Sequence, residues 1–410
     1  MVVALYLPYS ISTLAIICFV IHAFFNGQWK RPEGKFWKKH QLALAFALYF
    51  AVGLLSLLYS QDLTQGWESL SSMAAFLFIP MAISAYPLQE QKRMLYTGSR
   101  WFFIATCAVI LYYFMAFMVL NASLTIIEFI LPLRLEKLID LDAYSLRKLG
   151  GQFRHPAYFS IYIGLSLIIA IKLATCQRAR WKKAILYLST GPMFLFLFLL
   201  QSRMVVIAFF VVIIIFAFTL KRYRRVLLPL VIGLIALSTL IATLAPDNIA
   251  SRFADFETLE YKKTDTDFNG ITVRLAIWEE AWAQIKKQPL LGVGLGDMRQ
   301  TMLDAYAESG LQYALDRKLE PHNQYITSWL AMGLPGLLCL LWIFYLLIVP
   351  GFKSGDFIAY LSPLFLAISA ISESVLIRHY GIVILCSLLF LQSLVAMRQK
   401  EKQPVKKGEK

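Results

Sequence analysis

Long apolar runs alternate with short polar segments along most of the chain. Each run is roughly twenty residues long, which is the length that an α-helix needs to cross a bilayer. Strands of a membrane β-barrel need only about ten residues, so runs of this length favour helices. We find eleven runs, at roughly 4–25, 41–60, 69–86, 101–120, 156–174, 184–201, 203–220, 226–244, 324–349, 357–376 and 380–397. The pattern predicts an all-α polytopic membrane protein.

The segments between the runs divide the chain into parts. The run at 69–86 is the weakest, because serines and Pro80 interrupt it. A tilted or re-entrant segment is an alternative to a full span there. Only 121–155 and 245–322 are long enough to fold outside the membrane. We therefore predict a transmembrane bundle of about eight spans at 1–244 with the outer loop 121–155, a large helical loop at 245–322, further spans at 323–397 and a basic tail at 398–410.

Composition agrees with a membrane protein. The 410 residues are 59% hydrophobic and 16% charged, whereas soluble domains average about 45–50% apolar and 25% charged. The mean hydropathy is +0.62. The run at 4–25 lacks a basic start and a small-residue cleavage site, so we do not predict a secretory signal peptide there.

The net charge of +15 reports membrane topology. One alternating set of loops holds 24 Lys and Arg with 5 Asp and Glu, and the other holds 16 and 20, which together make the 40 and 25 of the chain. The basic set comprises 26–40, 87–100, 172–183, 221–225, 350–356 and the tail from 397. The positive-inside rule makes this set cytoplasmic and the loop 245–322 external. We expect the basic clusters to meet anionic lipids, and no nucleic-acid partner.

The same assignment places the C-terminus inside and the N-terminus outside. An outside N-terminus without a cleavable signal is unusual. A missing helix before the first run would give a more regular protein of twelve spans with both ends inside.

The external loop contains a helical pattern. Apolar residues recur with a period close to 3.6 over 271–288, and Arg274 and Trp278 fall on one face. Pro289 ends this helix, and the glycines of 292–296 predict a tight connection. Asp297 and Gln300 have the spacing of a capping box, opening a helix that ends near Gly310.

Several kinds of chemistry are not indicated. The five cysteines lie in runs or at a cytoplasmic end, without disulfide or zinc spacing. Gly292-Val-Gly-Leu-Gly lacks the Lys-Ser/Thr of a phosphate loop. Asp265-Thr-Asp267 has polar flanks with no strand before it, so we do not assign it to a metal. We expect neither a cofactor nor a metal.

Three ionisable residues fall on the external side beside apolar runs. His322 precedes the run at 324–349, and histidine is well suited to proton transfer near neutral pH. Arg203 stands between two runs, where a charge is expensive unless it is paired or wet, and Arg274 lies in the loop. Each has an ordinary alternative: a helix-end histidine, a snorkelling arginine and a solvated helix face. Together, a base and two guanidinium groups suit a diphosphate-linked substrate.

Two further external positions carry cations. Arg154 and His155 precede Pro156, which suits a first helical turn where backbone amides favour anions. Arg378-His379 lies at another external run end, where it can pair with Glu373 or contribute to a cavity.

Several motifs follow one another in a recognisable order. They are Arg274 with Trp278, Pro289-Leu-Leu-Gly-Val-Gly-Leu-Gly, His322-Asn-Gln-Tyr and Gly333-Leu-Pro-Gly-Leu-Leu. This order resembles the O-antigen ligase / O-antigen polymerase superfamily, in which an Arg and a Trp precede a PL-GVG-G segment, an HN pair and a G-PG segment. Ser202-Arg203 is similar to the family's arginine between spans. The resemblance covers about 40–397, and 271–336 is its specific part.

The resemblance implies a twelve-span inverting glycosyltransferase of the bacterial inner membrane. Such an enzyme transfers a completed glycan from undecaprenyl diphosphate to lipid A–core or a similar acceptor at the periplasmic face, without metal or ATP. The family's essential histidine and arginines correspond to His322, Arg274 and Arg203. The residues expected to bind substrate are Arg154, His155, Trp278, Asn323 and Arg378. Our count of eleven spans departs from the family.

Two other functions stay open. An O-antigen or exopolysaccharide polymerase would use the same donor with a second lipid-linked repeat as acceptor. The large loop in the second half and the His-Asn pair favour a ligase. A transporter or flippase would require discontinuous helices and ions near mid-membrane, whereas most ionisable residues here lie at run ends or in loops. The identities of the glycan and the acceptor, and the oligomeric state, are not indicated.

Overall fold

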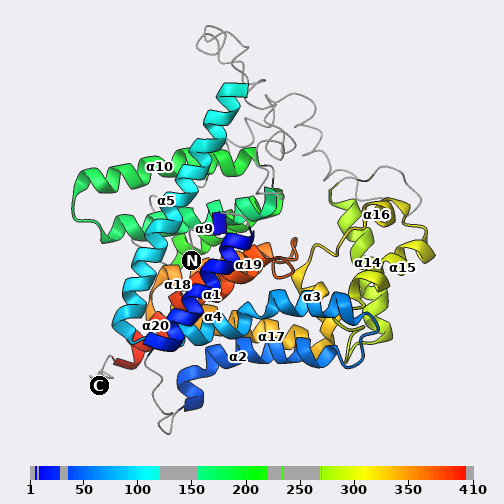
Figure 1. Cartoon of the computed structure of the whole chain (residues 1–410). Helices are drawn as coiled ribbons and strands as arrows, with labels where there is room; N and C mark the ends of the chain where they lie inside the picture. Colours follow the sequence, from blue (N-terminus) through cyan, green and yellow to red (C-terminus); the bar gives the residue numbers. More distant parts are fainter. Residues whose placement is uncertain are drawn as a thin grey trace, which may run out of the picture. The chain divides into compact units, whose positions relative to one another are not determined.

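The structure is a computed structural model of the 410-residue chain (Figure 1). It describes residues 5–6, 9–27, 36–120, 156–200, 202–219, 232–233, 268 and 270–402. Within these ranges the regular elements are helices, and no strand occurs. The predicted all-α fold class is therefore confirmed.

The helices follow the apolar runs of the sequence. They are α1 (Tyr9–Asn26), α2 (Phe36–Ser56), α3 (Leu63–Met73), α4 (Ala75–Ser84), α5 (Leu88–Leu120), α9 (Pro156–Cys176), α10 (Arg180–Leu199), α11 (Arg203–Thr219), α14 (Thr272–Lys287), α15 (Met298–Ser309), α16 (Gln312–Arg317), α17 (Gln324–Ser354), α18 (Phe357–Ser369), α19 (His379–Ile384), the π-helical turn η2 (Leu385–Leu389) and α20 (Phe390–Lys402).

The helices make the chain a polytopic membrane protein. In the described part of the chain, six helical segments are long and apolar enough to cross a bilayer, and shorter apolar helices accompany them at His40–Ser56, Arg203–Thr219 and Phe357–Ser369. The predicted run at 226–244 lies almost wholly outside the described residues. The count of eleven spans therefore stays a prediction.

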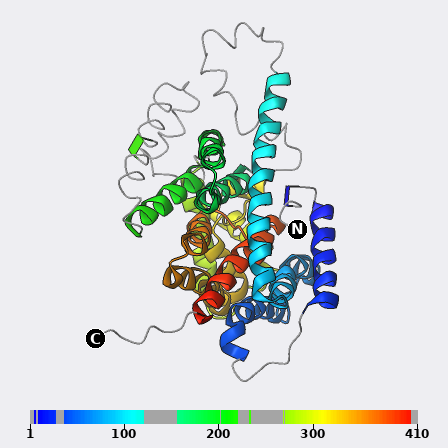
Figure 2. The same ribbon diagram turned by 90° about the vertical axis from the view of Figure 1, so that its left-hand side faces the viewer.

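Four helices depart most clearly from the expected boundaries. The weak third run is two helices, α3 and α4, which meet at Ala74. α18 ends at Ser369, earlier than the predicted run. α5 continues through 88–100, which we had predicted to be a loop; Figure 2 shows it as one long helix. Its 33 residues reach about 50 Å at 1.5 Å per residue, so the helix exceeds a hydrocarbon core of about 30 Å.

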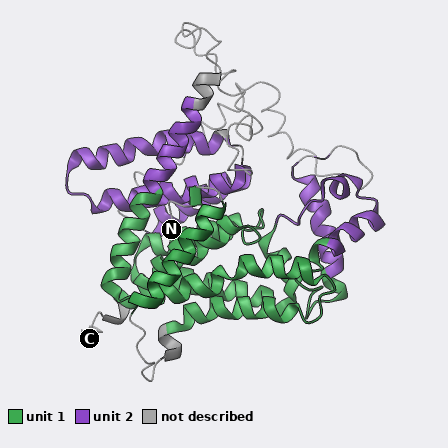
Figure 3. Cartoon of the chain, in the orientation of Figure 1, with its two compact units in different colours: residues 1–102, 285–299, 323–410 green, residues 103–284, 300–322 purple. Residues whose placement is uncertain are grey.

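The chain divides into two compact units (Figure 3). Unit 1 comprises 1–102, 285–299 and 323–410, and unit 2 comprises 103–284 and 300–322. These units are defined by compactness, and the predicted parts by their relation to the membrane. The units therefore do not test the division into 1–244, 245–322, 323–397 and 398–410, which stays a prediction.

Unit 1 is built around α17, which packs against α2, α18 and α20. Its core includes the fully buried rings of Phe46, Phe76 and Phe390. A polar contact crosses this core, because the hydroxyl groups of Tyr49 and Ser328 lie 2.8 Å apart. α17 is thus held on several sides within unit 1.

Unit 2 contains α9, which is buried along nearly all its length and packs against α10 and α11. Tyr113 of α5, Phe159 and Phe196 pack their rings together. The hydroxyl groups of Thr106 and Ser166 lie 2.6 Å apart. A helix that is apolar on all sides is typical of the interior of a membrane bundle.

Candidate functional site

α17 is broken at Gly333, and the loop after α14 repairs the break. Gly333 has φ 64° and ψ −167°, so the helical hydrogen bonds stop there. The amides of Val293 and Gly294 donate to the carbonyls of Leu330 (2.8 Å) and Ala331 (3.0 Å). These bonds satisfy carbonyl groups that the break leaves without a helical partner. We call this arrangement, residues 289–297 with the break in α17, the glycine joint; it lies within unit 1.

Glycine is required at several positions of this joint, because neighbouring backbone segments leave no room for a Cβ atom. Gly292 has φ 72°, and a Cβ atom there would lie 2.5 Å from the amide nitrogen of Gly333. A Cβ atom on Gly333 would collide with the carbonyl oxygen of Leu290, and one on Gly296 with that of Asp62. The tight connection predicted from these glycines is confirmed. Its role here is packing of backbone on backbone.

Side chains anchor the same joint. The indole N–H of Trp329 donates to the Pro289 carbonyl at 3.0 Å, and the Tyr59 hydroxyl donates to the Leu291 carbonyl at 2.6 Å. The Asp297 carboxylate accepts the amides of Gln61 and Asp62, both at 2.8 Å. These bonds tie the loop after α14 to α17 and to the segment between α2 and α3.

The Gln300 half of the predicted capping box is not formed. The Gln300 side chain donates to Asp304 at 2.8 Å, one turn further along α15, so it does not reach back to residue 297. The predicted helix ends are confirmed, because α14 stops at Lys287 before Pro289 and α15 stops at Ser309 before Gly310.

The start of α17 is fixed by Asn323. Its side-chain oxygen accepts the amides of Tyr325 (3.0 Å) and Ile326 (3.1 Å), which makes it the N-cap of the helix. The Gln324 amide donates to the Ala370 carbonyl at 2.8 Å, and its side-chain oxygen accepts the Leu376 amide at 2.7 Å. Capping occupies the oxygen of Asn323 and leaves the NH₂ group as the remaining donor of this buried side chain.

His322 has an unusual backbone conformation. Its φ is +48°, in the left-handed region, and its side chain is half-buried. This region costs an L-residue roughly 1–2 kcal/mol, and non-glycine residues held there cluster at functional sites. Lys318 is the other non-glycine residue with positive φ in the described ranges (φ 49°), and it ends α16.

α14 holds the segment that carries His322. The indole N–H of Trp278 donates to the carbonyl of Pro321, the residue before His322, at 2.7 Å. Arg274 lies one turn earlier on the same helix face. Its Nη1 donates to the Gly270 carbonyl at 3.0 Å, and its Nε is buried. The structure therefore brings Arg274, Trp278 and His322 onto one part of unit 2. We call residues 270–284 and 300–322 the His322 module.

Sequence reasoning missed a buried polar group in this module. Tyr306 is fully buried, and its hydroxyl donates to the Leu319 carbonyl at 3.0 Å. Burial, and then the carboxylates of Glu280 and Glu320, raise the pKa of Tyr306 well above its ordinary value. Glu280 itself is buried on α14 while Glu279 is exposed. Two adjacent acids on an amphipathic helix usually indicate a solvated face. Only the positions of the apolar residues around the helix could have predicted that Glu280 is buried.

The other predicted residues lie on other elements. Arg203 is the first residue of α11 in unit 2, half-buried, with its Nη1 shielded from solvent. Arg378 is exposed at the N-cap of α19 in unit 1. The neighbouring His379 is buried, with its Nε2 2.9 Å from the Ser12 hydroxyl oxygen. Arg154, His155 and the Asp265-Thr-Asp267 triplet lie outside the described residues.

The comparison with protein families agrees with the motifs. Residues 188–341 match the family model described as O-Antigen ligase. No curated protein matches the chain. The matched range runs from α10 into α17, so it contains Arg203, the His322 module and both sides of the glycine joint. The resemblance inferred from the sequence is confirmed over residues 188–341, which are similar to the O-antigen ligase superfamily.

Proposed function

We propose that the protein transfers an O-antigen or related glycan from undecaprenyl diphosphate to lipid A–core or a similar acceptor, at the periplasmic face of the inner membrane. The hydrogen bond from Trp278 to Pro321 carries this proposal, because it holds His322 beside the helix that bears Arg274. The family match supports the general class of reaction. The multi-pass helical fold supports a substrate that lies in the membrane.

In the proposed reaction, an acceptor hydroxyl attacks the anomeric carbon of the donor sugar. A new carbon–oxygen bond forms as the bond from that carbon to phosphate breaks, and the electron pair leaves with the diphosphate. His322 takes the hydroxyl proton. Attack opposite the leaving group inverts the anomeric carbon. The donor's own diphosphate supplies the driving force, so the step needs no ATP, and in this proposal arginines rather than a metal ion neutralise the diphosphate.

The two arginines have an electrostatic role in this proposal. Negative charge grows on the diphosphate as the sugar–phosphate bond breaks. Guanidinium groups of Arg203 and Arg274 offer planar, bidentate donors to phosphate oxygens and stabilise that charge. Each has a nitrogen shielded from water, where an electrostatic interaction is stronger than in bulk solvent.

The remaining residues are proposed to position substrates. Trp278 offers an aromatic surface beside His322, and Asn323 offers its NH₂ group. Arg154, His155 and Arg378 offer further donors to anionic or hydroxylated groups. The left-handed backbone at His322 favours a fixed imidazole, because a strained conformation persists only where its surroundings hold it.

The broken α17 bears on the transporter alternative. Discontinuous helices are typical of transporters, in which the freed carbonyls coordinate ions. Here the carbonyls of Leu330 and Ala331 accept amides from the glycine joint instead. The break therefore has a structural use, and it does not favour transport over transfer.

The test is the lipopolysaccharide of a strain that lacks the gene, together with its lipid-linked glycans. A bare core with long polymer accumulating on undecaprenyl diphosphate is the expected result. Core bearing a single repeat unit would identify a polymerase, and an unchanged ladder would contradict both. Complementation with His322→Ala should not restore ligation, whereas Arg299→Ala, at an exposed position of α15, should restore it fully.

A further inference from the structure

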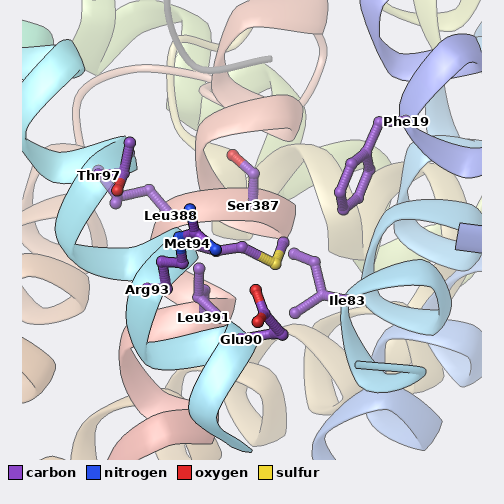
Figure 4. A pocket seen from close by; sticks show the side chains of 10 residues that line it. Phe19, Ile83, Glu90, Arg93, Met94, Thr97, Ser387, Leu388 and Leu391 are labelled. Carbon is purple, nitrogen blue, oxygen red and sulfur yellow. The ribbon is translucent and has the colours of Figure 1, made fainter. Parts of the chain in front are cut away.

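Unit 1 contains a pocket that the proposed reaction does not use. It has a volume of about 320 Å³ and lies between α1, α4, the first turns of α5 and the helix that contains η2 (Figure 4). Its apolar wall includes Ile83, Leu388 and Leu391. Glu90 and Arg93 of α5 are the charged residues that line it. The pocket is therefore amphiphilic, with apolar and charged surfaces in one cavity.

A π-helical turn borders this pocket. η2 lies between α19 and α20, and the Ser387 hydroxyl of η2 donates to the Val383 carbonyl of α19 at 2.5 Å. Ser387 and Leu388 of this turn line the cavity. Single π-helical turns carry an energetic penalty and occur often at functional sites. The turn gives evidence for a binding role that is independent of the charges.

The two charges are available to a ligand. Glu90 and Arg93 lie one turn apart on α5, and both side chains are exposed. Within the described residues, neither side chain makes a hydrogen bond or an ion pair. An anion beside Arg93 and a cation beside Glu90 would satisfy both. A ligand that carries only negative charge would be repelled by Glu90.

We propose that this pocket binds a zwitterionic phospholipid with a primary ammonium head group. Arg93 contacts the phosphate and Glu90 contacts the ammonium. Ile83, Leu388 and Leu391 contact the first part of an acyl chain, which continues into the bilayer. The charge topology of the sequence places the first turns of α5 at the cytoplasmic surface, where head groups lie. This proposal does not depend on the proposed glycosyl transfer.

The experiment is native mass spectrometry of the full-length protein. The protein is stripped of lipid in detergent and equilibrated with equal amounts of phosphatidylethanolamine, phosphatidylglycerol and phosphatidylcholine. Wild type should retain one phosphatidylethanolamine in preference to the other two. Arg93→Gln should lower this retention roughly tenfold, as expected for loss of a charge-assisted hydrogen bond. Arg100→Gln is the matched control, because Arg100 is exposed on the same helix but does not line the pocket.

Two further variants separate charge from shape. Glu90→Gln should remove the preference for phosphatidylethanolamine over phosphatidylglycerol, since the anion is no longer repelled. Thr97→Trp places a large side chain at the lining and should lower retention of all three lipids. Equal retention by Arg93→Gln and Arg100→Gln would overturn the proposal, and so would wild-type protein that retains all three lipids equally.

Discussion

The glycine joint and the His322 module lie side by side in the sequence, yet their residues are used in opposite ways. The joint is made of backbone groups and glycines, and the carbonyls freed by the break in α17 receive hydrogen bonds from the loop after α14. The module holds buried or strained ionisable groups, with His322 at positive φ and Glu280 shielded from water. One family motif thus contains a part that sets geometry and a part suited to chemistry.

The largest effect is expected at the strained histidine. His322→Gly relieves the left-handed conformation, so the free energy of unfolding should stay unchanged or rise by up to about 1 kcal/mol. Glycosyl transfer should fall roughly 10²- to 10⁴-fold because the general base is lost. Transfer by purified protein and its thermal unfolding midpoint are the measurements.

Lys318→Gly is the matched control for this variant, since Lys318 has the same backbone conformation in the same module. It should show the same stability change with unaltered transfer. Loss of transfer in both variants would assign the effect to backbone flexibility.

Substitutions in the glycine joint should lower the free energy of unfolding. Gly333→Ala combines a positive φ with a collision against the Leu290 carbonyl, and it should destabilise the protein by more than about 3 kcal/mol. Gly355→Ala has a similar φ but open space around the added atom, so it should cost about 1–2 kcal/mol. Both are measured by unfolding in detergent. Equal losses would mean that the joint contributes nothing beyond backbone strain.

Two tryptophans offer a closer comparison, because each indole donates to a proline carbonyl. Trp278→Phe removes the bond to Pro321, and Trp329→Phe removes the bond to Pro289. Each should cost about 0.5–1.5 kcal/mol of stability. Transfer measured on folded protein should decline only for Trp278→Phe. Of the two indole bonds, the one to Pro321 holds the His322 segment and the one to Pro289 does not. Comparable rates for the two variants would remove the distinction between the regions.

The smallest effect concerns Tyr306. Its pKa is raised in the folded protein, so its contribution to stability is fully present below the ordinary tyrosine pKa of about 10 and is lost as the pH rises through the folded value. Between pH 7 and 9, Tyr306→Phe should be less stable than wild type by about 0.5–1.5 kcal/mol. Above about pH 10 this difference should shrink. A constant difference across the whole range would show that the phenol does not titrate in this way.

Much of the helical framework could be predicted from the sequence. A run of about twenty apolar residues has few alternatives in a bilayer, and the 3.6 period of 271–288 correctly predicted α14. The first turns of α5 were missed because their polar residues lower the hydropathy, although Gln, Glu, Lys and Arg are good helix formers. Hydropathy reports burial in lipid, and it does not report where a helix extends into water.

The residues of the candidate site were proposed from the sequence and stay a prediction, whereas their geometry could not be predicted from it. Arg274 and Trp278 share a face because of their spacing, and the structure adds that this face meets Pro321. The bonds from Val293 and Gly294 to α17 join residues about forty positions apart, and no local pattern encodes such pairing. The positive φ of His322 and the burial of Glu280 likewise depend on tertiary packing.

The most direct test of the central claim is the transfer rate of purified Arg274→Ala with a lipid-diphosphate donor. The account predicts a loss of roughly 10²- to 10³-fold, as for removal of a group that stabilises developing negative charge, with an unfolding midpoint close to that of wild type. Full transfer activity in a normally folded Arg274→Ala protein would contradict it.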